Sequence, residues 1–373
     1  MENKNPDIAL FMQTLDVGGV ERMMLHLAQG FVQKNLTVDL VLLRASGRLL
    51  QQVPANVRIV NLNCARTYLS LGKLWQYLRR ERPKALISAL EGPNLVAIVA
   101  KWLSGRKIRH AISINCFVSL VYTPANADIY TRRVRARLSY AALKILYRFA
   151  DHCVAISSGV ANDISRVAKI PRQRVHVFNL PVITPTLQEK MKEAVHHDWF
   201  HPGAPPVIIA VGRLTDAKDY PTLLKAFWTL HKRRSARLII VGEGELQYEL
   251  QRQILELGLE GAVALLGYVE NQYAYMARAS VFVLSSAWEG LSAVLIEALS
   301  CGTKVVSTDC HSGPREILED GKWGRLVRVG DSEALAVAIE ESLDLAASLP
   351  PAEALDRFSL ETVVNHYRKL LLL

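Results

Sequence analysis

Apolar residues near the start of the chain alternate between short continuous runs and helical stripes. Residues 8–13 (IALFMQ) form the first run, and residues 37–43 (TVDLVLL) form another. Between them, six apolar residues recur three or four positions apart: Val20, Met23, Met24, Leu27, Ala28 and Phe31. This spacing predicts a helix with a buried face, flanked by two buried strands. The segment therefore predicts a βαβ unit, in which Gly18 and Gly19 form the turn from strand to helix.

The same alternation restarts in the second half of the chain. Apolar runs at 85–89 and 152–156 predict two more strands of the first set. Strands of a second set are predicted at 206–214, 237–244, 262–269, 281–286 and 304–309. We therefore expect an α/β protein with two Rossmann-like domains, each built on a parallel sheet.

Prolines and a closing helical pattern set the expected domain boundaries. The prolines lie between the two sets of strands, at Pro181, Pro185, Pro202, Pro205 and Pro206. We expect a first domain over 1–185, a linker over 186–205 and a second domain over 206–357. Residues 358–373 have helical spacing and are expected to pack back toward the first domain.

Composition supports two ordinary cores. A chain of 373 residues is too long for one core, and half of its residues are hydrophobic. The cysteines are scattered singly, as reduced thiols in a cytoplasmic protein would be, and favour neither disulfides nor a zinc site: Cys64, Cys116, Cys153, Cys301 and Cys310. The sequence has no signal-peptide pattern and no uninterrupted apolar run of about 18 residues, so we expect a soluble or peripheral protein.

The net charge of +10 is unevenly divided along the chain. Residues 1–195 hold 28 Lys and Arg against 12 Asp and Glu, whereas residues 196–373 hold 17 against 23. A basic first half favours an anionic partner, and residues 130–148 combine Arg132, Arg133, Arg135 and Arg137 with apolar positions at helical spacing. This pattern is typical of a helix at a membrane interface. A core helix with solvated arginines explains it equally simply.

The segment 281–313 carries the most specific chemistry. A strand ends near Ser285, a loop carries Glu289 and Gly290, and a helix is predicted from Ser292, whose hydroxyl suits an N-cap. The N-terminus of such a helix, at the carboxyl edge of a sheet, favours an anionic phosphate. Two carboxylates, Glu289 and Glu297, can reach different ends of one ligand.

These residues resemble the retaining GT-B glycosyltransferases of the family-four (glycosyl transferases group 1) type, which include bacterial cell-envelope polysaccharide and lipopolysaccharide sugar transferases. Glu289 and Glu297 are similar to the E-x7-E pair of that family. Five further segments follow in the family's order: 18–22 (GGVER), 211–214 (VGRL) with Lys218, 241–244 (VGEG), 267–269 (GYV) and 312–316 (SGPRE). The resemblance therefore covers nearly the whole chain. It implies the GT-B fold, in which the parallel sheets of two Rossmann-like domains face each other across a cleft.

The resemblance implies roles for individual residues. Arg213 and Lys218 would hold the diphosphate of a nucleotide sugar, in place of a metal, and cations there stabilise the leaving group. Glu297 would accept hydrogen bonds from ribose hydroxyls, and Glu289 would hold the donor sugar beneath its reacting carbon. Arg213, Lys218 and Glu289 are thus the catalytic candidates. Further donor-binding positions are Gly18, Gly19, Gly242, Val269, Gly290, Leu291 and Ser292.

Some positions depart from the family pattern. Leu291-Ser292 stands where many members carry Phe-Gly or Leu-Pro, so the phosphate contact is expected to differ in detail. A histidine of the N-terminal domain cannot be aligned, and His110 is the nearest candidate on the acceptor side. Glu91 is a second acceptor-side candidate. Each has a plain structural alternative, as a strand histidine and a loop acid.

The resulting expectation is a hexosyltransferase that uses a nucleotide-sugar donor, with UDP favoured, and a glycan or polyprenyl-diphosphate-linked acceptor. We expect no cofactor, no metal and no nucleic-acid partner, and a cytoplasmic location, peripheral on the inner face of the cell membrane. Two alternatives stay open: a nucleotide-sugar epimerase on the same fold, and a non-catalytic protein that binds a nucleotide sugar or an anionic surface. The first calls for additional acids around the sugar, and the N-terminal half is poor in acids.

Overall fold

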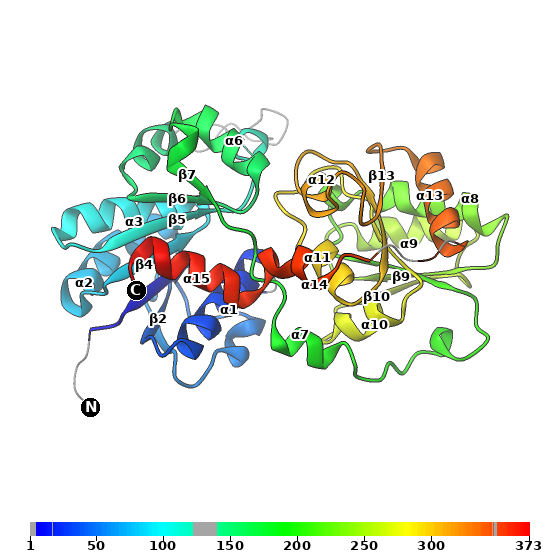
Figure 1. Cartoon of the computed structure of the whole chain (residues 1–373), viewed down its shortest axis with the longest axis horizontal. Coiled ribbons are helices and arrows are strands. Elements are labelled where there is room, and N and C mark those ends of the chain that lie inside the picture. The colour runs from blue at the N-terminus through cyan, green and yellow to red at the C-terminus, as the bar shows by residue number, and fades with distance from the viewer. Residues whose placement is uncertain (1–4, 17, 122–139, 345, 347–348) are drawn as a thin grey trace. The chain divides into compact units, whose positions relative to one another are not determined.

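The computed structural model describes residues 5–16, 18–121, 140–344, 346 and 349–373. The chain divides into two compact units. Unit 1 comprises Met1–Val182 and Phe358–Leu373, and unit 2 comprises Ile183–Arg357. Both units are α/β (Figure 1), as the hydrophobic pattern predicts. None of the helices in the described ranges is both long and apolar enough to cross a bilayer.

Unit 1 is built on a parallel sheet in the order β3-β2-β1-β4-β5-β6-β7. Its strands are β1 (Ile8–Met12), β2 (Val38–Leu42), β3 (Arg58–Asn61), β4 (Ala85–Ala89), β5 (Arg109–Ile114), β6 (His152–Ala155) and β7 (Val175–Val177). Its helices are α1 (Gly19–Gln33), α2 (Leu71–Glu81), α3 (Glu91–Ser104), α4 (Val118–Val121), α6 (Ser158–Ala168) and α15 (Leu360–Leu371). The chain moves in opposite directions from β1 to β2 and from β4 to β5, so right-handed crossovers place α1 and α3 on opposite faces.

The C-terminal helix α15 packs against α1 within unit 1. A side chain at Gly30 of α1 would overlap Val364, because its Cβ would lie 2.4 Å from the Val364 Cγ2 atom. The absence of that side chain lets the two helices approach closely. An ion pair of 2.6 Å between Lys34 and Glu361 joins them at the surface.

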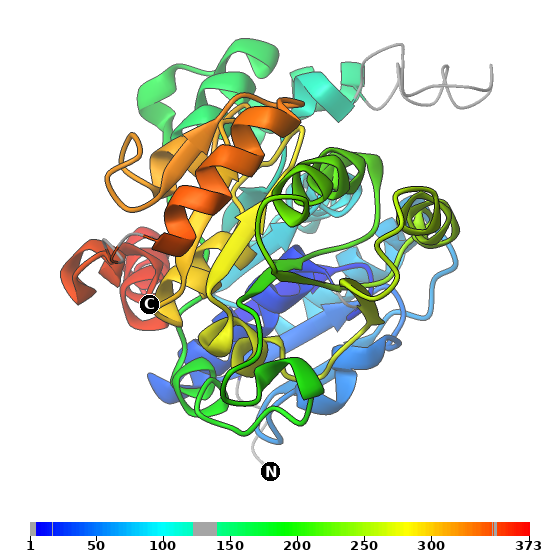
Figure 2. The same ribbon diagram turned by 90° about the vertical axis from the view of Figure 1, so that its right-hand side faces the viewer.

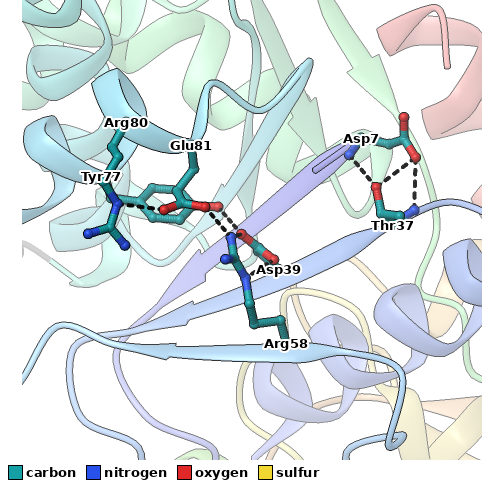
Figure 3. Close-up of polar contacts among 7 residues, drawn as sticks. All are labelled: Asp7, Thr37, Asp39, Arg58, Tyr77, Arg80 and Glu81. Atoms are coloured by element: carbon teal, nitrogen blue, oxygen red, sulfur yellow. Dashed lines mark hydrogen bonds and ion pairs between the residues drawn. The ribbon is translucent and has the colours of Figure 1, made fainter. Parts of the chain in front are cut away.

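Polar side chains fix the amino edge of the unit 1 sheet, where the strands begin (Figure 3). The Arg58 guanidinium donates to Asp39 of β2 and, at 2.7 Å, to Glu81 at the end of α2. The Tyr77 hydroxyl donates to Asp39 at 2.6 Å, and burial, together with the Asp39 charge, raises the pKa of Tyr77. The network ties β2, β3 and α2 together and neutralises two buried carboxylates.

Unit 2 has a second parallel sheet, in the order β10-β9-β8-β11-β12-β13. Its strands are β8 (Val207–Val211), β9 (Arg237–Val241), β10 (Val263–Gly267), β11 (Val281–Leu284), β12 (Lys304–Thr308) and β13 (Arg325–Val327). Its helices are α7 (Pro185–Lys190), α8 (Tyr220–His231), α9 (Gln247–Glu256), α10 (Gln272–Arg278), α11 (Ala293–Ser300), α12 (Pro314–Ile317), α13 (Ser332–Asp344) and α14 (Ala352–Leu355). Helices α8 and α13 pack side by side over it (Figure 2).

Residues 186–205, expected to be a linker, belong to unit 2. The helix α7 occupies the first part of this segment, with Thr184 as its N-cap. The Asn271 side-chain amide donates to the Lys190 carbonyl at 2.8 Å and to Glu193 at 2.7 Å. These contacts hold the segment against α10, and sequence periodicity does not detect them because α7 is too short.

Candidate functional site

The loops after β8 and β9 run side by side at the carboxyl edge of the unit 2 sheet, the edge where ligands of such sheets bind. The Gly212 amide donates to the Val241 carbonyl, and the Leu214 amide donates to the Glu243 carbonyl, each at 3.0 Å. A Cβ atom at Gly242 would lie 1.9 Å from the Gly212 carbonyl oxygen. Gly242 is therefore required for backbone packing, whatever its contact with a ligand.

Lys218 and Glu289 form a pre-assembled ion pair at this edge. The Lys218 ammonium lies 2.5 Å from Glu289 Oε1, and the Ser286 hydroxyl donates to the same oxygen at 2.7 Å. The Ser285 hydroxyl holds the Lys218 carbonyl at 2.7 Å. No residue in the described part of the chain donates to Glu289 Oε2. One carboxylate oxygen thus fixes the orientation of Glu289 and the other remains available to a ligand.

Neighbouring groups respond to the charge of Glu289. Burial raises the pKa of the Cys310 thiol to about 12, and the Glu289 carboxylate adds to the rise. Burial and Glu289 also raise the pKa of Tyr220, whose hydroxyl donates to the Gly212 carbonyl at 3.0 Å. Both groups stay neutral at pH 7, so they contribute no charge of their own beside the Lys218–Glu289 pair.

Helix α11 begins beside this pair, as the sequence predicts. Gly302 follows its C-terminus with φ +76°, the left-handed conformation expected of it. The expected capping bond of Ser292 is wrong, however. The Ser292 hydroxyl caps no amide of α11, is 1% exposed and has no hydrogen-bond partner among the described residues. The backbone at Ser292 is extended, with φ −80° and ψ 99°.

The other predicted donor-side residues differ in their surroundings. Glu297 is 3% exposed and accepts a hydrogen bond of 2.5 Å from the Gln272 side chain. Arg213 is exposed, with no hydrogen bond or ion pair to its side chain from another described residue. Val269 and Gly290 are half-buried in loops of the carboxyl edge, and Leu291 is buried. The structure therefore brings Lys218 and Glu289 together, and leaves Glu297 in a separate hydrogen bond.

The candidates of unit 1 lie at the ends of two strands. Gly18 is the N-cap of α1, and no atom lies within 4 Å of a Cβ built at Gly19, so the space beside it is open. Glu91 is the first residue of α3 and accepts a hydrogen bond of 3.1 Å from the Cys116 thiol. Leu90 before it has φ +75°, a conformation that is strained for leucine and marks this turn.

His110 lies in the core of unit 1. Its side chain is fully buried, and its Nε2 atom is 2.9 Å from the Ser88 hydroxyl. Because that hydroxyl donates to Asn94, Nε2 carries the proton and donates to Ser88. Burial lowers the pKa of His110 to about 3, with Lys101 adding to the shift. A neutral, inaccessible ring gives the acceptor-side role of His110 no support, and its structural alternative explains these contacts.

Sequence reasoning missed three side chains that position the candidates. Ser285 and Ser286 orient Lys218 and Glu289, and Gln272 binds Glu297. Ser285 and Ser286 lie at the end of a predicted strand and precede the candidate acid Glu289 by four residues or fewer. This spacing is a signal by which the two serines could have been predicted. Within the described ranges, no three His, Cys, Asp or Glu residues cluster as a metal site would need.

Two Rossmann-like units, each built on a parallel sheet, are the architecture of the GT-B glycosyltransferases. Residues 191–357 match the family model of the glycosyl transferases group 1, and residues 17–184 match that of glycosyltransferase family 4. The chain therefore belongs to the family-four (glycosyl transferases group 1) glycosyltransferases.

Two curated relatives are glycosyltransferases by name, and the name of the second places it in lipopolysaccharide core biosynthesis. The chain is 32% identical, over 68% of its length and 66% of the relative's, to the N-acetylgalactosamine-N,N'-diacetylbacillosaminyl-diphospho-undecaprenol 4-alpha-N-acetylgalactosaminyltransferase of Campylobacter jejuni. It is 28% identical, over 95% of its length and 96% of the relative's, to the lipopolysaccharide core biosynthesis glycosyltransferase LpsE of Rhizobium meliloti. The match therefore spans slightly less than two thirds of the first relative and nearly all of the second.

A solved structure shares the fold across the whole chain. Anabaena HepE, solved in complex with UDP and glucose, superposes with a TM-score of 0.77 at 20% identity, and the match covers 98% of this chain and 99% of HepE. At this identity the likeness concerns the fold alone.

Proposed function

We propose that this protein is a retaining glycosyltransferase that moves a hexose or N-acetylhexosamine from a nucleotide diphosphate sugar, with UDP favoured, to a glycan or lipid-linked glycan acceptor in envelope polysaccharide synthesis. One observation carries the proposal: the Lys218–Glu289 pair, oriented by Ser286, at the carboxyl edge of the unit 2 sheet. Unit 2 binds the donor in this proposal, and unit 1 binds the acceptor.

The leaving diphosphate needs positive charge where its own negative charge grows. Lys218 supplies one cation, and Arg213, exposed and without a partner among the described residues, is free to supply another. The first amides of α11 and the unpartnered hydroxyl of Ser292 are hydrogen-bond donors for a phosphate oxygen. These groups replace a metal in the proposal, and no cofactor is required.

Glu289 holds the donor sugar in this mechanism. Its Oε1 atom is occupied by Lys218 and Ser286, so Oε2 accepts hydrogen bonds from sugar hydroxyls. The same negative charge favours oxocarbenium character at the reacting carbon. Retention follows if the departing phosphate takes the proton of the acceptor hydroxyl on the same face, so that no protein base is needed. Glu297 binds ribose hydroxyls if its carboxylate exchanges the hydrogen bond from Gln272.

The names of the relatives support the choice of substrates. The Campylobacter relative takes an undecaprenol-diphosphate-linked acceptor by its name, and HepE was solved with UDP. We propose the same classes here, with Gly18, Gly19 and Glu91 on the acceptor or phosphate side. A lipid-linked acceptor implies work at the inner face of the membrane. The basic segment 130–148 was expected to dock there, but Arg132, Arg133, Arg135 and Arg137 lie outside the described residues.

A thermal-shift comparison tests the donor class. A ligand that binds only the folded state raises its stability by RT ln(1 + [L]/Kd), about 2.7 kcal/mol at one hundred times Kd. We expect UDP and UDP-sugars to raise the unfolding temperature more than GDP at equal concentration. Arg213→Ala should reduce the UDP shift, whereas Lys225→Ala on the exposed face of α8 should not. Equal shifts with UDP in all three proteins would remove Arg213 from the donor site.

A further inference from the structure

The buried carboxylate of Glu297 is bound by a side chain of a neighbouring helix. Glu297 lies in α11, and its Oε2 atom accepts a hydrogen bond of 2.5 Å from the side-chain amide of Gln272, the first residue of α10. The two helices pack against each other (Figure 1). A carboxylate is costly to bury unless hydrogen-bond donors face it. The Gln272 amide supplies such a donor, so the contact stabilises the ligand-free protein.

The backbone on both sides of Gln272 is fixed. Asn271, the N-cap residue of α10, accepts a hydrogen bond of 3.3 Å from the Ala274 amide. Further along the helix, the Thr303 hydroxyl donates to the Met276 carbonyl at 2.7 Å. Gln272 can therefore leave Glu297 by rotation of its own side chain, without movement of the helix.

The side chain of Gln272 is held more weakly than the side chains around Glu289. No residue of the described ranges other than Glu297 forms a hydrogen bond with the Gln272 side chain. Lys218 and Ser286, in contrast, both donate to one oxygen of Glu289. Rotation of Gln272 away from Glu297 breaks one hydrogen bond and restores the large rotamer freedom of a glutamine side chain. The contact is therefore suited to exchange.

A ribose can replace the Gln272 amide at Glu297. Its hydroxyls donate to a carboxylate as the amide does. Glu297 is 3% exposed, so a ligand reaches the carboxylate only after a covering side chain moves. Gln272, 8% exposed and bonded to Oε2, is such a side chain. The ribose and Gln272 therefore compete for one carboxylate.

We infer that Gln272 is a built-in competitor of the donor's ribose: it binds Glu297 in the ligand-free protein, leaves when the ribose arrives, and returns when the nucleoside diphosphate departs. The inference rests on the proposed function, because that function assigns the ribose to Glu297. The exchange replaces one hydrogen bond with another, so the ribose hydroxyls add little net affinity. Weak retention of the leaving nucleotide favours turnover, since product release limits the rate of many enzymes.

Calorimetric titration with UDP and with dideoxy-UDP, which lacks both ribose hydroxyls, tests the inference. Gln272→Met keeps the length of the side chain and removes its donor. We expect this variant to bind UDP roughly tenfold more tightly than the unmodified chain does, the fold-change that corresponds to one hydrogen bond to a charged group. Binding of dideoxy-UDP should not tighten, because this ligand has no hydroxyl for Glu297. A glutamine that served the fold alone would not weaken UDP binding, so its removal would not strengthen it.

A second variant should change the affinity in the opposite direction. Gln272→Lys keeps a donor and adds a positive charge, so it should hold Glu297 more firmly and weaken UDP binding relative to dideoxy-UDP. The matched control is Gln253→Met on α9, where the side-chain amide donates to the Pro221 carbonyl at 3.4 Å. The control removes a glutamine hydrogen bond elsewhere in unit 2 and should change neither affinity.

Two results would overturn the inference. One is an unchanged ratio of the UDP and dideoxy-UDP dissociation constants in Gln272→Met, or in Gln272→Lys if the first variant does not fold. The other is weaker UDP binding by Gln272→Met, which would make Gln272 a support of Glu297 and not its competitor. Acceptor-dependent release of UDP from a UDP-sugar by the unmodified chain separates the two proposals. With that release, either result leaves the proposed function standing, whereas a chain that neither binds nor releases UDP contradicts both.

Discussion

At the scale of single residues, the account depends on Glu289 having two different oxygens. One is held by Lys218 and Ser286, and the other has no donor among the described residues. Glu289→Gln keeps the shape of the side chain and removes its charge. We expect turnover to fall by about two to three orders of magnitude, the usual effect of removing one preorganised electrostatic group.

The control for this prediction is Glu249→Gln, an equal change of charge at an exposed position of α9. Nucleoside-diphosphate release measures turnover, and the unfolding temperature checks that both variants fold. Turnover of Glu289→Gln within a few fold of the control would exclude Glu289 from the reaction.

Ser292 gives a prediction in which stability and binding change in opposite directions. A buried hydroxyl without a partner lowers stability by about 1–3 kcal/mol. Ser292→Ala should therefore leave the ligand-free protein as stable or more stable in urea, and should weaken its stabilisation by UDP. A loss of ligand-free stability with an unchanged UDP shift would show that the hydroxyl serves the fold and not the phosphate.

At the scale of elements, strand β5 carries a pH-dependent contribution to the stability of unit 1. Folding keeps His110 neutral down to its lowered pKa of about 3, whereas the unfolded chain takes up the proton near pH 6.5. The unfolded state thus binds more protons across this window, and the free energy of unfolding falls as pH falls. The slope for one proton is about 1.4 kcal/mol per pH unit.

His110→Gln should flatten this slope, because glutamine can donate to Ser88 and does not titrate. Urea unfolding at about pH 7.5 and about pH 5 measures the difference. Burial lowers the pKa values of His26, His152 and His176 as well, so part of the acid sensitivity will remain. An unchanged slope would mean that His110 is not held neutral in the folded protein.

Most elements were predictable because their signal is local. The stripe from Val20 to Phe31 and the runs at β2, β4 and β8 through β12 predicted their helix and strands within a few residues. Ser292 is the N-cap residue of α11, as predicted, but the absence of a capping bond from its hydroxyl was not predictable, because such a bond depends on loop geometry that composition does not fix. The Gln272–Glu297 contact joins residues 25 positions apart, and no periodicity reports such a pairing.

At the scale of the whole molecule, the sequence predicted two parallel sheets but not the full boundary between the units. The close approach of α15 to Gly30 depends on one missing side chain, which a sequence shows only as a glycine in a helix. The charge asymmetry did indicate a basic first half. Resemblance in motif order supplied what composition could not, namely the reaction.

The most direct test of the central claim is acceptor-dependent release of nucleoside diphosphate from UDP-hexose and UDP-N-acetylhexosamine donors, measured with a polyprenyl-diphosphate-linked glycan. The account predicts release that requires the acceptor and forms one new α-linked product, consistent with retention from an α-linked donor. Two results would contradict the account. One is conversion of the donor into its epimer without acceptor, and the other is binding of the UDP-sugar with no release of UDP in the presence of any acceptor.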